Sequence, residues 1–104
     1  MSGRAPPGSF QARVIDTMAL IGDASDNVPG APGIGKVTAA KIINRWGSLD
    51  AALLSAATGW RDHVMTARMA NILVQHREQI FMSRELVRLD TVTDRLIARG
   101  VRLP

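Results

Sequence analysis

Apolar residues recur at three- and four-residue spacings along most of the chain, and this period is typical of helices. The first such segment runs from Gln11 to Ile21 and stops at Gly22. A second covers residues 36–46 and stops at Gly47, a typical C-terminal cap. The apolar stripe of this second helix consists of Val37, Ala40, Ile42, Ile43 and Trp46. The pattern therefore predicts two helices joined by the polar, glycine-rich stretch between them.

The second half of the chain continues the helical pattern. Ser48 is placed to cap a short third helix through Leu54, and Thr58 with Gly59 ends it. From Trp60 to Leu89 the chain keeps helical spacing without any Gly or Pro. This segment is longer than the usual globular helix of about 8–20 residues, so we expect two helices with a bend between Asn71 and Gln79.

No segment keeps a period-two alternation beyond a few residues, so a sheet has little support. With 104 residues, 46% apolar residues and no Tyr, the chain must build its core from aliphatic side chains and Ala. We therefore predict an all-α fold, a compact bundle of about five helices. Residues 11–94 are expected to form the domain, residues 1–10 a disordered lead-in and residues 95–104 a loosely structured tail.

Charge and cysteine content exclude some classes of site but do not identify the function. Thirteen Lys and Arg against nine Asp and Glu give a net charge of +4, which fits either a nucleic-acid partner or a mildly basic surface. The absence of Cys excludes disulfides and thiolate metal sites. No apolar run is long enough to span a membrane, so no membrane contact is expected and a cytoplasmic location is the default interpretation.

The glycine loop, residues 28–35, reads Val-Pro-Gly-Ala-Pro-Gly-Ile-Gly and stands directly before the second predicted helix. The first amides of a helix lack internal partners and can bind an anion. Glycines allow close approach of a phosphate, while Pro32 stiffens the turn and Ile34 can anchor it in the core. A plain interhelical turn is the alternative. The residues expected to bind a phosphate are Gly30, Gly33, Ile34, Gly35, Lys36, Thr38 and Lys41.

A family resemblance supports the phosphate interpretation. Pro-Gly-Ile-Gly at 32–35, followed by Thr38 and an aliphatic helix, resembles a helix-hairpin-helix DNA-binding element. The preceding string Ala-Leu-Ile-Gly-Asp-Ala-Ser-Asp-Asn-Val-Pro-Gly at 19–30 is similar to the five-prime nuclease family of bacterial DNA polymerase I, phage exonucleases and flap endonucleases. The likeness continues through residues 46–50 and, more weakly, through residues 82–94. It implies a helix-three-turn-helix subdomain that grips duplex DNA by its phosphates without reading the bases.

The same resemblance assigns metal-site positions. Asp23 and Asp26 match carboxylates that help to hold the second divalent ion of the nuclease, which would be Mg²⁺ or Mn²⁺. The other carboxylates of the family come from a preceding α/β domain, so this segment alone is not expected to catalyse, and no catalytic residue is assigned. Family members also bind a monovalent cation, K⁺, through loop carbonyls. Relatives commonly carry the basic residue two positions after the last loop glycine, where this chain has Val37 after Lys36.

Each of these residues also has a structural explanation. Asp23 and Asp26 are residue types that cap helices and form turns. We expect Asp16 to be structural, His63 and His76 to be surface or partly buried, and Trp46 and Trp60 to be core or partly buried anchors. The later arginines either extend the phosphate footprint or form a solvated face; they are Arg61, Arg68, Arg77, Arg84 and Arg88.

Three functions remain open from the sequence. The leading hypothesis is a sequence-nonspecific duplex-binding domain of a metal-dependent five-prime to three-prime exonuclease or flap endonuclease, active in DNA replication and repair. Its partners would be duplex DNA and an α/β nuclease domain in the same or another chain. The alternatives are a protein-interaction domain that kept this scaffold, or a nuclease that completes its metal site by self-assembly.

Overall fold

The computed structural model describes residue 6 and residues 8–89. Its elements are α1 (Phe10–Ile21), the 3-10 turn η1 (Ala24–Asp26), α2 (Lys36–Trp46), α3 (Leu49–Ala57), α4 (Ala67–Gln75) and α5 (Arg77–Leu89). The described part of the chain contains no strand, only an isolated bridge between Asp23 and Val28. The predicted all-α fold of about five helices is confirmed. The expectations for residues 1–5, for the tail from residue 90 and for the likeness at residues 90–94 lie outside the described residues.

Local chemistry fixes where the helices begin and end. The side chains of Ser9, Ser48 and Thr66 each accept a hydrogen bond from an amide in the first turn of the helix that follows. Gly47 ends α2 in the left-handed conformation, as predicted, and its amide bonds to the Ile43 carbonyl. The expected bend in the second half of the chain falls at His76, which separates α4 from α5. These boundaries follow from cap residues that the sequence displays.

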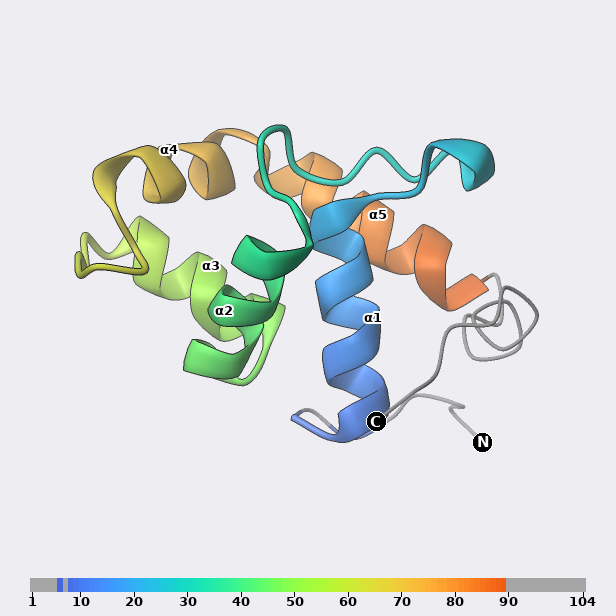
Figure 1. Cartoon of the computed structure of the whole chain (residues 1–104), viewed down its shortest axis with the longest axis horizontal. Helices are drawn as coiled ribbons and strands as arrows, with labels where there is room; N and C mark the ends of the chain where they lie inside the picture. Colours follow the sequence, from blue (N-terminus) through green and yellow to red (C-terminus); the bar gives the residue numbers. More distant parts are fainter. Residues whose placement is uncertain (1–5, 7, 90–104) are drawn as a thin grey trace.

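The core lies where α1 and the α2–α3 pair meet the two C-terminal helices. α1 packs against α5 on one side and α2 on the other, and α3 packs against α4 (Figure 1). The largest fully buried apolar side chains are Leu20, Ile42, Ile43, Leu49, Met65, Leu73 and Ile80. Trp46 packs against this cluster as expected. The loop between α1 and α2 runs along the top of the molecule as drawn in Figure 1.

Three expectations about burial and helix extent are wrong. Residues 60–66 are not helical, because the Asp62 carboxylate accepts hydrogen bonds from the amides of Val64 and Met65 at 2.8 and 2.7 Å and holds a bent segment. Trp60 is 53% exposed, with its indole N–H donating to Asp62. Val37, predicted on the apolar stripe of α2, is 69% exposed, and Ala39 is buried instead.

A buried polar network joins three helices. The Asp16 carboxylate on α1 accepts a 2.8 Å hydrogen bond from the Leu49 amide, at the start of α3. Arg84 on α5 lies 3.7 Å from Asp16 and makes a bidentate contact with Asp50 at 2.6 and 3.2 Å. Burial raises the pKa of Asp16, whereas the hydrogen bond from Arg84 lowers the pKa of Asp50. Asp16 is thus structural, as expected, since it supplies an acceptor to the N-terminus of α3.

Candidate nucleic-acid interface

The turn that carries Asp23 and Asp26 closes on itself directly after α1. Asp23 and Val28 exchange backbone hydrogen bonds of 2.7 and 2.9 Å, and the Asp23 carboxylate accepts from the amide and hydroxyl of Ser25. Asn27 adopts the left-handed conformation, which Asn tolerates, and its amide bonds to the Ala24 carbonyl. Asp23 therefore has a capping function in the protein, and both aspartates belong to one tight turn.

Two glycines let the ends of this turn touch. Gly22 and Gly30 both have positive φ angles, of 82° and 66°. A Cβ atom on Gly30 would lie 2.6 Å from the Gly22 amide nitrogen, and one on Gly22 would lie 2.8 Å from the Val28 carbonyl oxygen. No side chain fits between these backbones. The close approach brings the start of the glycine loop against the end of α1.

The loop is then tied to α5 at Gly30. The Gly30 amide donates to the Ser83 hydroxyl at 3.0 Å, and the Gln79 side-chain amide donates to the Gly30 carbonyl at 2.8 Å. Ser83 is fully buried and donates in turn to the Gln79 carbonyl. The next residue, Ala31, donates its amide to the Leu20 carbonyl of α1 at 2.8 Å. These contacts fix the position of the loop relative to α1 and α5.

Beyond Ala31 the loop presents its glycines outward. Ile34 is 5% exposed and anchors the loop in the core, as expected. Gly33 and Gly35 on either side of it are exposed. Gly33 has a φ of 81°, whereas Gly35 has a φ of −93°, in extended conformation, so only Gly33 adopts a backbone conformation that favours glycine. The loop thus alternates an inward apolar anchor with outward glycines.

The N-terminus of α2 lacks a side-chain cap. Gly35 occupies the cap position, and no side-chain hydrogen bond satisfies the first amides of this helix. By contrast, α1, α3 and α4 are each capped by a hydroxyl. Lys36 and Lys41 are exposed on α2 and form no ion pair with any described residue, and Thr38 is half-buried. The start of α2 therefore offers backbone donors and positive charge to an anion in solution.

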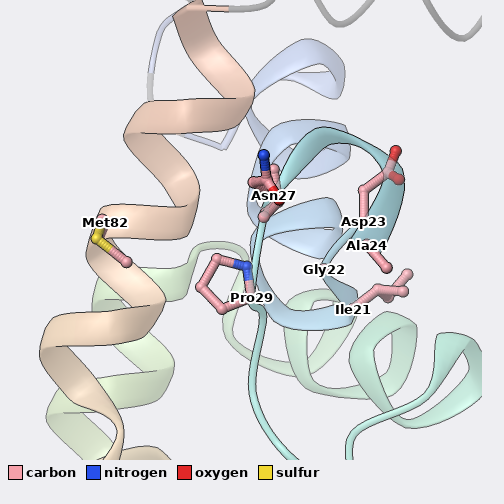
Figure 2. A pocket seen from close by; sticks show the side chains of 8 residues that line it. Ile21, Gly22, Asp23, Ala24, Asn27, Pro29 and Met82 are labelled. Carbon is pink, nitrogen blue, oxygen red and sulfur yellow. The ribbon is translucent and has the colours of Figure 1, made fainter.

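An open pocket of about 530 Å³ adjoins the Asp23 turn. Its lining comes from residues 21–24, 27–29 and Met82 of α5. Figure 2 shows Pro29 on the side of the loop nearer Met82, while the Asp23 carboxylate points outward, away from α5. The carboxylate thus stands at the rim of a mainly apolar hollow.

The aspartates alone provide few metal ligands. Among the described residues no group of three or more His, Cys, Asp or Glu could hold a metal ion. Asp23 and Asp26 lie in one turn, and carboxylate oxygens suit Mg²⁺ or Mn²⁺, so the donor chemistry fits a divalent ion that has further ligands elsewhere. Within the described helices, none is both long and apolar enough to cross a membrane.

The fold and loop define a class of small helical domains that expose a glycine loop at an uncapped helix start. The chain belongs to the family described as 5'-3' exonuclease, C-terminal SAM fold, whose model matches residues 10–98. It is similar to DNA polymerase I of Bacillus caldotenax, with 35% identity over 79 residues, which cover 76% of this chain and 8% of that protein. It is also similar to the thermostable DNA polymerase I of Thermus thermophilus, with 39% identity over 77 residues, covering 74% and 9%.

A third relative, DNA polymerase I of Rhizobium leguminosarum, is 39% identical over 79 residues, covering 76% of this chain and 7% of that protein. The chain thus spans less than a tenth of the length of these relatives. No solved structure matches the chain. The predicted membership of the five-prime nuclease family is confirmed.

Proposed function

We propose that this domain binds duplex DNA through its phosphates, without reading base sequence, as part of a five-prime to three-prime exonuclease. The observation that carries the proposal is the uncapped start of α2 beside the exposed glycine loop. Helix N-termini with free amides bind phosphate oxygens because the donors and the helix dipole both favour an anion. Contacts of this type position a protein on DNA but carry no base information.

The proposed contacts divide into those that touch DNA and those that hold the loop. Gly33 and Gly35 admit a phosphate close to the backbone, and Lys36, Thr38 and Lys41 add charge and a hydroxyl from α2. Gly30 and Ile34 contribute to the site by holding the loop in place. The Gly30 amide and carbonyl both form hydrogen bonds with side chains of α5, and the Ile34 side chain is buried. The loop is thus fixed before DNA arrives, and little ordering entropy opposes binding.

The metal assignment belongs to the same proposal. Asp23 and Asp26 would contribute carboxylate oxygens to an Mg²⁺ or Mn²⁺ site that an α/β nuclease domain, in the same or another chain, completes. When bound, the ion would neutralise charge on the phosphate that is cleaved. K⁺ would bind carbonyl oxygens of the glycine loop. A role on DNA also agrees with the cytoplasmic location expected from the sequence.

A duplex-binding titration tests the proposal. Fluorescence anisotropy of two labelled duplexes of unrelated sequence should give equal dissociation constants at a given salt concentration. Affinity should fall as salt rises, with a log–log slope of about −0.9 for each phosphate contact. Preference for one sequence, or a folded protein without DNA affinity at low salt, would contradict the proposal, and the second result would favour a protein-interaction domain. Cleavage of a flap substrate with Mg²⁺ alone would favour the self-assembling nuclease.

A further inference from the structure

The glycine loop lies against one face of α4 at Gly33, although the two segments are distant in sequence. A Cβ atom placed on Gly33 would lie 3.4 Å from a guanidinium nitrogen of Arg68 and 3.8 Å from the Cδ1 atom of Ile72. Arg68 and Ile72 are four residues apart on α4 and therefore lie on the same face. Ile72 packs against the core, whereas Arg68 is exposed. The guanidinium thus stands at the edge of the loop, next to its exposed glycine.

Among the described arginines after residue 60, Arg68 differs from the others in having no partner among the described residues. Arg84 pairs with Asp50, Arg88 with Glu85, and Arg61 donates to the carbonyls of Ala56 and Trp60. Arg77 stacks on Phe81. Arg68 forms neither an ion pair nor a hydrogen bond with the residues that the structure describes. Its five N–H donors are therefore available at the loop.

Arginine at this position has a specific chemical consequence. The guanidinium fork matches two oxygens of one phosphate, a geometry that a lysine ammonium cannot reproduce. It stands beside a loop whose exposed glycine leaves the backbone accessible, and the described residues supply no carboxylate to neutralise it. Two positive features, the start of α2 and the Arg68 side chain, thus flank one exposed turn. An anion with several oxygens would satisfy both.

We propose that Arg68 binds the DNA backbone together with the glycine loop, so that α4 supplies a phosphate contact in addition to α2. This inference rests on the proposed duplex binding and extends it to a helix outside the glycine-loop motif. The sequence left open which of the later arginines contact phosphate, and this inference separates them. Arg68 belongs to the phosphate footprint, whereas Arg61, Arg84 and Arg88 are engaged within the protein.

The test compares three variants of the full chain on a labelled duplex of about 20 base pairs, at several salt concentrations. Arg68→Ala should weaken binding about tenfold and reduce the magnitude of the salt slope by about one, because one phosphate contact is lost. Arg68→Lys should keep the slope and recover only part of the affinity, since the charge remains but the fork does not. Arg88→Ala removes the same charge at the far end of α5 and should change affinity less than about twofold.

The outcomes separate the two proposals. If the wild-type chain binds and Arg68→Ala binds with unchanged affinity and slope, the Arg68 contact is refuted while duplex binding stands. Equal losses in Arg68→Ala and Arg88→Ala would also refute it, since they would show a general charge effect. If the wild-type chain binds no duplex at low salt, the proposed function itself fails. Thermal melting of all variants shows whether a loss of binding reflects unfolding.

Discussion

Replacing Gly35 by Asp should raise the stability of the domain and lower its affinity for DNA. Gly35 is the uncapped N-terminal cap of α2, with a φ of −93° that any residue can adopt. A Cβ atom at this position would meet nothing within 4 Å. An Asp side chain can therefore enter without strain and accept a hydrogen bond from the first amides of the helix.

The stability gain follows from two small effects. Asp at a helix cap is favoured over Gly by a few tenths of a kcal/mol, and its charge near the helix N-terminus adds about 0.3–1 kcal/mol. The sum, about 0.5–1.3 kcal/mol, should raise the melting temperature by about 2–10 °C for a domain of this size. The change of affinity has the opposite sign, because the carboxylate occupies the donors that we assign to phosphate and repels it. Loss of one charge-assisted hydrogen bond corresponds to about 1.5–3 kcal/mol, or roughly a tenfold to hundredfold weaker complex.

Calorimetry and duplex anisotropy on the same protein samples measure both effects. Gly35→Asn provides the uncharged cap and should lose less affinity than Gly35→Asp. Gln11→Glu adds the same charge to the first turn of α1, at the opposite end of that helix from the glycine loop, and should leave affinity nearly unchanged. A Gly35→Asp variant that melts higher and still binds duplex as tightly as the wild type would refute the assignment of these amides to phosphate.

Three further changes test the supports of the loop and of the bent segment before α4. Gly30→Ala should lower the free energy of unfolding, measured by urea denaturation, by about 2–4 kcal/mol, because its Cβ would lie 2.6 Å from the Gly22 nitrogen at a positive φ. A decrease below about 1 kcal/mol would contradict the close contact. Ser83→Ala should lower the free energy of unfolding by about 1–3 kcal/mol, because the Gly30 amide loses its buried acceptor. Hydrogen exchange of the Gly30 amide should become faster, and an unchanged exchange rate would count against that hydrogen bond. The hydrogen bond from the Met65 amide holds the pKa of Asp62 in the folded protein well below its ordinary value. The ionised carboxylate therefore stabilises the fold at pH values above about 3.9, the pKa of Asp in the unfolded chain. This stabilisation is lost as the pH falls towards the pKa of the folded state. Asp62→Asn should therefore flatten the acid dependence of unfolding followed by tryptophan fluorescence, and an unchanged dependence would exclude Asp62 as its source.

Features with a local cause were predictable from the sequence. Gly47 ends α2, Ser48 caps α3 and Ile34 anchors the loop, each as the residue type and its neighbours indicate. The break between α4 and α5 was expected from length alone and falls at His76. The placement of the glycine loop directly before α2 also follows from neighbouring residues. Helix caps and turns act within a few residues, so a single sequence contains their signals.

Features with a distant or competing cause were not predictable. Ser83 meets Gly30 across 53 positions, and Asp16 meets the Leu49 amide across 33, so no spacing along the chain indicates either pair. The segment at 60–66 keeps helical periodicity, but Asp62 captures two amides that a helix would have used. The sequence does not distinguish Arg68 from the other late arginines as a phosphate ligand; its position beside Gly33 in the structure does.

Amide resonances at the start of α2 report most directly on phosphate binding. In a nitrogen–proton correlation spectrum titrated with a short duplex, the amides of Gly33, Gly35, Lys36 and Val37 should shift the most, and the shifts should shrink as salt is added. Shifts centred on another surface, with these four amides unmoved at saturating duplex, would contradict the assignment of this helix start to DNA.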